Sequence, residues 1–382
     1  MNDRQDTNSR PPDDRSSLSA IEMLYTERHS GDELDSEEEL CRLGLELAGS
    51  TDPKGQAEWL WRLGLIAQNR KDQLNAQVLY NQALKRFSAE ADVRGIARSH
   101  HQLSMILETL GDFPGALEHI RRSHLLFREV GDLHGMATNL HELSMIHEGL
   151  GNHREAADHA RQALMLFEQL GEPRNIVACR RRLSSLAQNE GDLGAAADHL
   201  RAALNVLGPD GDRLSVATLH HDLGLIGYAA DDHRRLSDHF QQALDIFDEI
   251  GDRRAVARVL HELGLIHLVL GDHSKATDYT TGALEIFEHL GDLPSTATGH
   301  RQLSAIFTLS GCIDAATASG ITGLAVARQL GLPIEEDLLW LRRQAELVGR
   351  TVFQQNLQKA GSEQAQRILS LVFGDGYHED ES

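Results

Sequence analysis

The sequence predicts an all-α fold: a solenoid, or superhelix, of about eight stacked helix pairs with capping helices at its C-terminal end. Three features support this prediction: a Gly-Asp-like pair that recurs every 20 residues, apolar residues at helical spacing between the pairs, and small residues that recur every 40 residues. Such a fixed period is typical of repeat proteins, in which each unit buries its apolar face only by stacking on its neighbours. The composition, 41% hydrophobic and 25% charged over 382 residues, is that of a folded chain.

The Gly-Asp-like pairs predict where helices end and begin. Glycine takes the left-handed conformation that ends a helix, and Asp or Asn caps the next helix. Clear pairs stand at Gly111-Asp112, Gly131-Asp132, Gly151-Asn152, Gly171-Glu172, Gly191-Asp192, Gly211-Asp212, Gly251-Asp252, Gly271-Asp272 and Gly291-Asp292. Weaker pairs on the same period, at Gly31-Asp32, Lys71-Asp72, Asp231-Asp232 and Gly311-Cys312, extend the array to about residues 14–331. Eight units of 40 residues fit this span.

Residues that recur 40 positions apart predict the core. Large ones form a leucine row (Leu63, Leu103, Leu143, Leu183, Leu223, Leu263, Leu303) and a phenylalanine row (Phe87, Phe127, Phe167, Phe247, Phe287). Small ones form two more rows (Ala76, Ala116, Ala156, Ala196, Ala276, Ala316 and Gly64, Ser104, Ser144, Ser184, Gly224, Gly264, Ser304). We expect the small residues to let helix backbones approach closely and the large ones to fill the space between them.

This order of residues, Leu-Gly/Ser, then Ile, Gly, Ala and Ala-Leu, resembles the tetratricopeptide repeat in its 40-residue form, found in Pins-like spindle-orientation adaptors and in bacterial regulators. The resemblance implies that the first helices of successive units line a concave groove that binds proteins or peptides. The usual aromatic residue near the start of the first helix is missing, and His100, Arg180, His220 or His300 stands there in four units. The asparagines that Pins-like proteins use to hold peptides are also absent, so we do not carry over their ligand.

The resulting domain organisation is a disordered N-terminal tail over 1–16, a solenoid over 17–331, capping helices over 332–373 and an acidic tail over 374–382. Within the solenoid, Gly208-Pro209 should end a helix early and Leu236 replaces the usual Ala, which predicts a local change of stacking. Amphipathic stretches at Glu335–Val348 and Val352–Phe373 are expected to cover the last open core. The alternative is that Leu369, Val372 and Phe373 form a docking or self-inhibiting helix.

Side chains on one face of the predicted first helices are the candidate partner-binding residues. They are Trp61, Leu65, Arg98, His101, Met105, His141, Met145, Arg181, His221, Leu225, Arg258, His261, Leu265 and Arg301, which we call the first-helix row. Basic residues and apolar ones four positions later share a helix face. This pattern favours a peptide with acidic and apolar residues, held more tightly near pH 6 as the histidines gain charge. The alternative is that these His and Arg residues pair with Glu142, Asp222 or Glu262 on neighbouring helices.

Other chemistry is not indicated. The formal charge of -21 argues against nucleic acid and acidic membranes as partners. Cys41, Cys179 and Cys312 lie far apart, so no disulfide framework, metal site or cofactor is expected, and a reducing cytoplasmic location fits. His141 and His147 are six residues apart and do not form the HExxH metal motif, and no phosphate-binding loop or nucleophile elbow occurs.

Together these observations predict a non-catalytic protein- or peptide-binding adaptor or scaffold that acts through the groove. Two alternatives stay open. One is a structural scaffold that self-assembles through its ends. The other is a peptide-responsive regulator similar to the bacterial Rap type, acting on a separate signalling protein.

Overall fold

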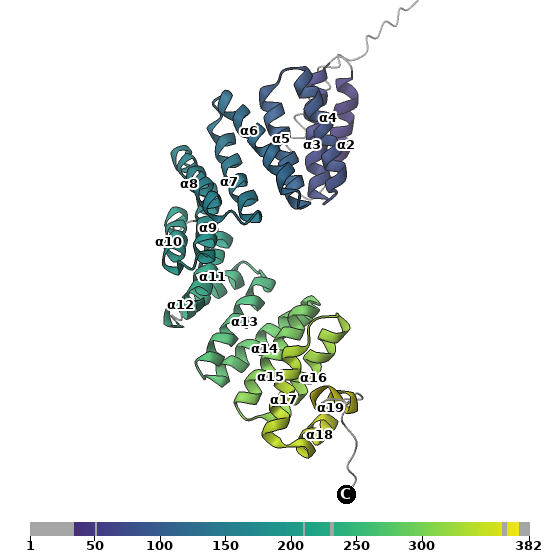
Figure 1. The fold of residues 1–382 in the computed structure, drawn as a ribbon, viewed down its shortest axis with the longest axis vertical. Helices are drawn as coiled ribbons and strands as arrows, with labels where there is room; N and C mark the ends of the chain where they lie inside the picture. The colour runs from purple at the N-terminus through teal and green to yellow at the C-terminus, as the bar shows by residue number, and fades with distance from the viewer. Residues whose placement is uncertain (1–33, 50–51, 209–210, 230–232, 361–364, 374–382) are drawn as a thin grey trace, which may run out of the picture. The chain divides into compact units, whose positions relative to one another are not determined.

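The computed structural model describes residues 34–49, 52–208, 211–229, 233–360 and 365–373, and every regular element in these ranges is an α-helix (Figure 1). The chain divides into two compact units, Met1–Glu190 and Gly191–Ser382, which we treat separately. The expected tails over 1–16 and 374–382, and the Gly31-Asp32 pair, lie outside the described residues. None of the described helices is both long and apolar enough to cross a bilayer.

The first unit is built from consecutive antiparallel helix pairs, which confirms the predicted all-α solenoid architecture. Its helices are α2 (Leu34–Ala48), α3 (Pro53–Asn69), α4 (Gln73–Ala89), α5 (Val93–Thr109), α6 (Phe113–Glu129), α7 (Leu133–Gly149), α8 (His153–Leu170) and α9 (Pro173–Asn189). The first helix of a pair packs on its second helix, as α5 does on α6. It also contacts the first helix of the next pair, as α3 does α5 and α5 does α7. Helices α3, α5 and α7 therefore form a continuous face.

The second unit continues the same pattern and ends in three further helices. It holds α10 (Leu193–Leu207), α11 (Arg213–Ala229), α12 (His233–Glu249), α13 (Arg253–Val269), α14 (His273–Leu290), α15 (Leu293–Leu309), α16 (Ile313–Gln329), α17 (Glu335–Val348), α18 (Arg350–Lys359) and α19 (Ala365–Phe373). The pairs α11–α12, α13–α14 and α15–α16 pack as in the first unit. The period of 40 residues thus holds in both units.

Most helix ends confirm the predicted role of the Gly-Asp pairs; the exceptions include Gly211, which is not left-handed, and Asn152 and Glu172, whose side chains do not cap the next helix. Gly111 has a φ of 80°, and Asp112 accepts a hydrogen bond from the backbone N–H of Gly115 at 3.0 Å. Lys71 and Ala91 take the same left-handed conformation, with φ of 63° and 53°, where other repeats have glycine. The turn geometry is therefore set by its position in the repeat as well as by glycine.

Close packing of the two helices in a pair explains the small-residue row. A Cβ atom added to Gly64 would lie 2.6 Å from Cε1 of Tyr80, and one added to Gly224 would lie 2.8 Å from Cε2 of Phe240. Each glycine thus faces a buried aromatic ring on the partner helix. The predicted leucine and phenylalanine rows are buried throughout, which confirms their assignment to the core.

The large residue Leu236, where other repeats have alanine, is accommodated by a smaller residue on the facing helix. Helix α10 ends early at Leu207, as Gly208-Pro209 predicts. Leu236 is fully buried, and the facing residue on α11 is Gly227, whose added Cβ would lie 2.8 Å from Cβ of Leu236. Other repeats place an alanine at the position of Leu236 and a larger residue at that of Gly227. Side-chain volume that other repeats place on the first helix of the pair therefore lies on the second helix, α12, in this repeat.

The C-terminal stretch forms three helices, where the sequence predicted two. Val352–Phe373 is divided between α18 and α19, and both contact α17. Leu369 and Val372 are buried in a cluster with Leu324 of α16, while Phe373 remains 43% exposed. Helix α17 contacts both α15 and α16, so it occupies the place of a further first helix.

Candidate functional site

The first-helix row lies where the sequence predicted it, on the odd-numbered helices from α3 to α15. Its members in the first unit are Trp61 and Leu65 on α3, Arg98, His101 and Met105 on α5, His141 and Met145 on α7, and Arg181 on α9. In the second unit they are His221 and Leu225 on α11, Arg258, His261 and Leu265 on α13, and Arg301 on α15. All fourteen are half-buried or exposed. Each unit brings part of the row together in a cavity.

A cavity of about 280 Å³ lies on the first-helix face of the first unit. It is lined by Trp61, Arg98, His101, Gln102, Phe127, Asp132, His134, Gly135, Thr138 and Asn139, from α3, α5, α6 and α7 and the turn before α7. Three of these residues belong to the predicted row. We call it the first-unit cavity.

The second unit has an equivalent cavity of about 370 Å³. It is lined by His221, Arg258, His261, Glu262, Phe287, Pro294, Ser295 and Thr298. Each of these eight residues stands four 40-residue repeats after a residue that lines the first-unit cavity. Arg, His, Phe and Thr are the same in both, whereas Trp61 is replaced by His221 and Gln102 by Glu262. The chain therefore builds the same kind of cavity once in each unit.

The two cavities differ in whether their arginine is paired with a carboxylate. Arg98 is paired with Glu58, with Nη2 2.6 Å from Oε2, and its guanidinium lies over the ring of Trp61, 4.5 Å from the ring centroid. The residue that corresponds to Glu58 in the second unit is Thr218. Within the described part of the chain, Arg258 has no ion-pair partner. The second-unit cavity therefore holds an unpaired positive charge, with the carboxyl of Glu262 one helical turn further along α13.

A chain of buried hydrogen bonds fixes His101. Ser123 Oγ donates to the carbonyl oxygen of Ala97 at 2.7 Å, so it can accept from Asn139 Nδ2, which lies 2.7 Å away. Asn139 Oδ1 then faces His101 Nδ1 at 2.7 Å and must accept from it. Neutral His101 is thereby held as the Nδ1–H tautomer, and its Nε2 is an acceptor. Sequence reasoning missed Asn139 and Ser123, although no other repeat has this pair at these two positions.

The expectation that mild acidification charges the row is wrong for His141, and burial opposes it at His101 and His261. Burial lowers the pKa of His101, although the hydrogen bond that its Nδ1–H donates to Asn139 opposes this effect. Burial, helped by Arg182, lowers the pKa of His141 to about 4, and burial also lowers the pKa of His261. His141 is therefore neutral at pH 6, and His101 and His261 take up a proton less readily than an unperturbed histidine.

Some residues of the first-helix row do pair with acidic side chains, as the alternative expected. Most of these acids are not the ones that were predicted. His221 Nδ1 lies 3.7 Å from Oδ1 of Asp222, but Asp222 is the next residue on the same helix and not on a neighbouring one. Arg301 instead binds Asp337 and Glu336 of α17, at 2.8 and 3.0 Å. Glu142 is buried beside Glu108, and burial together with this second carboxyl raises its pKa to about 8, so it is not a partner of His141.

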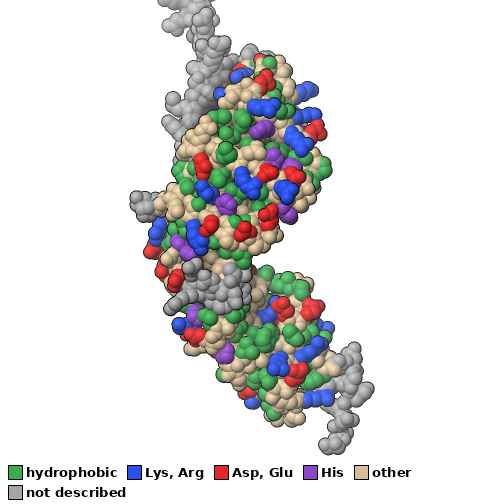
Figure 2. Space-filling view, turned by 60° about the vertical axis from the view of Figure 1, so that its left-hand side comes forward, with side chains coloured by type: hydrophobic (Ala, Val, Ile, Leu, Met, Phe, Trp, Pro, Cys, Tyr) green, Lys and Arg blue, Asp and Glu red, His purple; other side chains and the backbone are tan. Residues whose placement is uncertain are grey.

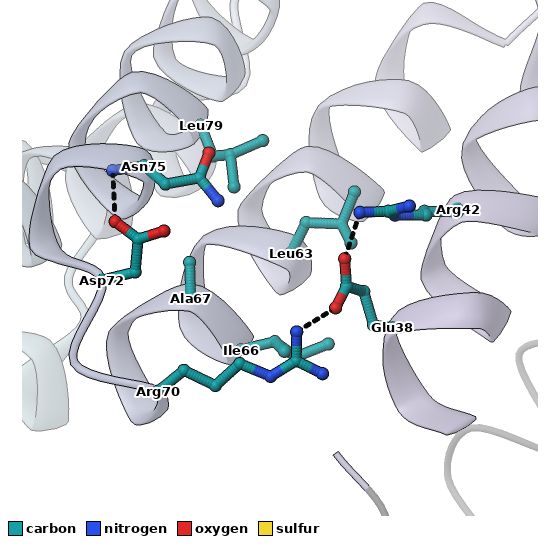
Figure 3. Close-up of a pocket in the computed structure, with 9 residues that line it drawn as sticks. All are labelled: Glu38, Arg42, Leu63, Ile66, Ala67, Arg70, Asp72, Asn75 and Leu79. Carbon is teal, nitrogen blue, oxygen red and sulfur yellow. Dashed lines mark hydrogen bonds and ion pairs between the residues drawn. The ribbon is translucent and has the colours of Figure 1, made fainter. Parts of the chain in front are cut away.

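A third cavity, of about 150 Å³, lies between α2, α3 and α4 (Figure 3). Leu63, Ile66 and Leu79 form its apolar wall. Figure 3 shows Glu38 bound to both Arg42 and Arg70 at its rim. Its charged groups satisfy one another, and it includes no member of the first-helix row.

Surface charges are mixed and not gathered by sign. Figure 2 shows acidic and basic side chains interspersed with hydrophobic ones on the face it presents. Among the residues described, no group of three or more His, Cys, Asp or Glu side chains is placed to hold a metal ion.

Comparison with known proteins identifies the repeat. Residues 95–169 and 215–289 match the tetratricopeptide repeat family. These two segments carry tetratricopeptide repeats. A comparison with curated proteins gives no match.

Solved structures of other tetratricopeptide-type proteins share the fold. The signal transduction ATPase with a tetratricopeptide repeat sensor from Pyrococcus horikoshii gives a TM-score of 0.64 at 13% identity, over 90% of this chain and 55% of that one. This chain thus spans about half of that protein. Apo RapI gives 0.54 at 16% identity, over 72% of this chain and 99% of that one. Aspartyl phosphate phosphatase F from Bacillus subtilis gives 0.54 at 13% identity over the whole of both chains. At these identities the likeness concerns the fold alone.

Proposed function

We propose that this tetratricopeptide-repeat chain is a non-catalytic adaptor or scaffold that binds a segment of another protein along its first-helix face. The observation that carries the proposal is the pair of equivalent cavities, one in each unit, both lined by first-helix row residues. Concave sites with apolar walls and a few placed polar groups are where proteins hold ligand side chains. Each unit therefore offers a site of its own to a partner segment.

The exposed parts of the row indicate what such a segment contains. Leu225 is 37% exposed, and Met105 and Met145 are half-buried on the same face, so apolar side chains of a partner would gain contact area there. Arg258 would complement an acidic side chain, because its guanidinium has no carboxylate partner within the described residues. Apolar residues with at least one acid are therefore the expected partner chemistry.

Affinity capture from the native cell extract tests this proposal. The test variant is Met105→Asp with Met145→Asp, which places two charges on the first-helix face. The matched control is Leu125→Asp with Met165→Asp, on the second helices α6 and α8, where the side chains are 51% and 69% exposed. We expect a partner that the wild type and the control retain and the test variant loses.

Two other outcomes would contradict the proposal. A partner held equally by all three proteins would move the binding site away from the first-helix face. If no partner is captured and the purified chain instead forms oligomers at micromolar concentration, the self-assembling scaffold would replace the adaptor.

A further inference from the structure

The first-unit cavity has a polar feature that the second-unit cavity lacks. Asn139, which locks His101, is fully buried and uses both ends of its amide inside the protein. The corresponding residues in the second unit are Gly299 and Ala283, which cannot hold His261 in the same way. The two cavities are therefore chemically different, although their walls correspond residue by residue.

The lock determines what His101 offers to a ligand. Its Nδ1–H is committed to Asn139, and His101 Nε2 has no hydrogen-bond partner among the described residues and is not sealed from solvent. Nε2 of the neutral ring carries a lone pair and can only accept a hydrogen bond. A ligand group beside it must therefore be a donor, and a carboxylate is disfavoured.

The surrounding side chains favour an aromatic body for that donor. Trp61 and Phe127 contribute ring surface to the wall of the cavity. The guanidinium of Arg98 lies over Trp61, 4.5 Å from its ring centroid, and over Phe87, 5.8 Å from its centroid, so it holds the Trp61 ring in place at the cavity wall. A volume of about 280 Å³ is ample for one aromatic side chain.

We propose that the first-unit cavity binds a tyrosine side chain of a partner protein, whose phenolic hydroxyl donates to Nε2 of His101 while its ring lies against Trp61 and Phe127. This proposal deepens the proposed function and rests on it, since it names one side chain that the first-helix face selects. His101, Trp61 and Phe127 are the recognising residues. Asn139 and Ser123 are positioning residues that act through His101.

The test compares N-acetyl-tyrosinamide with N-acetyl-phenylalaninamide, which differ by the hydroxyl alone. Both are titrated into the full chain at pH 8, with the indole N–H of Trp61 followed by NMR. We expect the tyrosine amide to bind about five- to tenfold more tightly, the effect of one neutral hydrogen bond. The preference should disappear in His101→Phe, whose folding is checked by its melting curve.

Two measurements on the wild type need no substitution. The ¹⁵N shifts of the His101 ring in the free protein should report Nδ1–H and an unprotonated Nε2. Acidification through the lowered pKa of His101 should abolish the tyrosine preference, because protonated Nε2 donates instead of accepting.

Each contrary result has a distinct meaning. Equal binding of the two amides, or an Nε2–H tautomer in the free protein, would overturn the tyrosine site and leave the adaptor function standing. The same holds if neither amide binds while the Met105/Met145 variant still loses a captured partner. Failure of that capture removes the adaptor function itself.

Discussion

Arg301 binds Asp337 through two hydrogen bonds, Nε to Oδ1 at 3.0 Å and Nη2 to Oδ2 at 2.8 Å. The side chain of Asp337 is fully buried and that of Arg301 is 22% exposed. The bond joins the last member of the first-helix row to α17, and Leu341 of α17, fully buried, takes the next place in that row. Arg301 thus holds the C-terminal helices, whereas Pro294, Ser295 and Thr298 at the start of the same helix, α15, line the second-unit cavity.

Asp337→Asn should loosen α17 from the second unit. The substitution leaves the charge of Arg301 without its buried counter-charge, and we expect a loss of about 2–4 kcal/mol in the free energy of unfolding. Trp340 lies on α17, so its fluorescence during chemical denaturation reports the effect there. Glu336→Gln is the matched control, because the Glu336 side chain is 73% exposed and its pairing with Arg301 should contribute less than about 1 kcal/mol. Equal losses for both variants would show that the buried pair has no special role.

A histidine pair in the first unit should make stability depend on pH. His100 Nδ1 of α5 lies 2.9 Å from His119 Nδ1 of α6, with Arg122 and Glu118 as the charged neighbours. Burial, reinforced by His119 and Arg122, lowers the pKa of His100 to about 4. Because the folded pKa lies below that of the unfolded chain, the stabilisation is complete above pH 6.5 and is lost as the pH falls towards 4.

The double variant His100→Leu with His119→Leu should remove this dependence. The preceding repeat already places Leu60 and Leu79 at these two positions, so the replacement pair suits the fold. Between pH 7 and pH 4.5 we expect the wild type to lose about 1–2 kcal/mol more than the variant in urea denaturation. Identical pH profiles would show that the pair is not the source of acid sensitivity.

The exchange of sizes at Leu236 can be tested as a double-mutant cycle. Leu236→Ala alone should cost about 2–4 kcal/mol, because it opens a cavity in a packed interface. Gly227→Ala alone should also destabilise, because the new methyl group meets Leu236. The double variant recreates the alanine pairs found at Ala67 with Ala76 and Ala187 with Ala196, so its loss should be smaller than the sum of the single losses. Additive losses would mean that the two positions are independent.

Much of the fold could be predicted because the residues that form its turns and core recur with a fixed period. The Gly-Asp pairs predicted most of the turns, and the leucine and phenylalanine rows predicted the core. The division of Val352–Phe373 into α18 and α19 was not predicted, because that stretch lies beyond the last repeat and has no period to define its turn. The left-handed turns at Lys71 and Ala91 also could not be predicted from residue type, because they follow from the position of these residues in the repeat.

The sequence predicted where the candidate site lies, but it did not predict the pKa values and hydrogen bonds of the side chains there. Helical spacing put His101 and His141 on the first-helix face, but burial changed their pKa values, and a sequence does not display burial directly. The locking of His101 depends on Asn139 in the next repeat and Ser123 on α6, two departures from rows that other repeats fill with different residues. Two residues that depart together from their rows, as Asn139 and Ser123 do, can therefore be used to predict such a contact from the sequence. The bond from Arg301 to Asp337 was missed because it crosses from the repeats into α17.

Site-specific photocrosslinking tests most directly whether the first-helix face is the working surface. A photoreactive phenylalanine analogue at Leu65, beside Trp61 on α3, should crosslink to a partner in the cell, whereas the same analogue at Leu125 on α6 should not. Crosslinking from Leu65 alone, removed by Met105→Asp with Met145→Asp, is the result predicted here. Crosslinking from Leu125 and not from Leu65 would contradict the account.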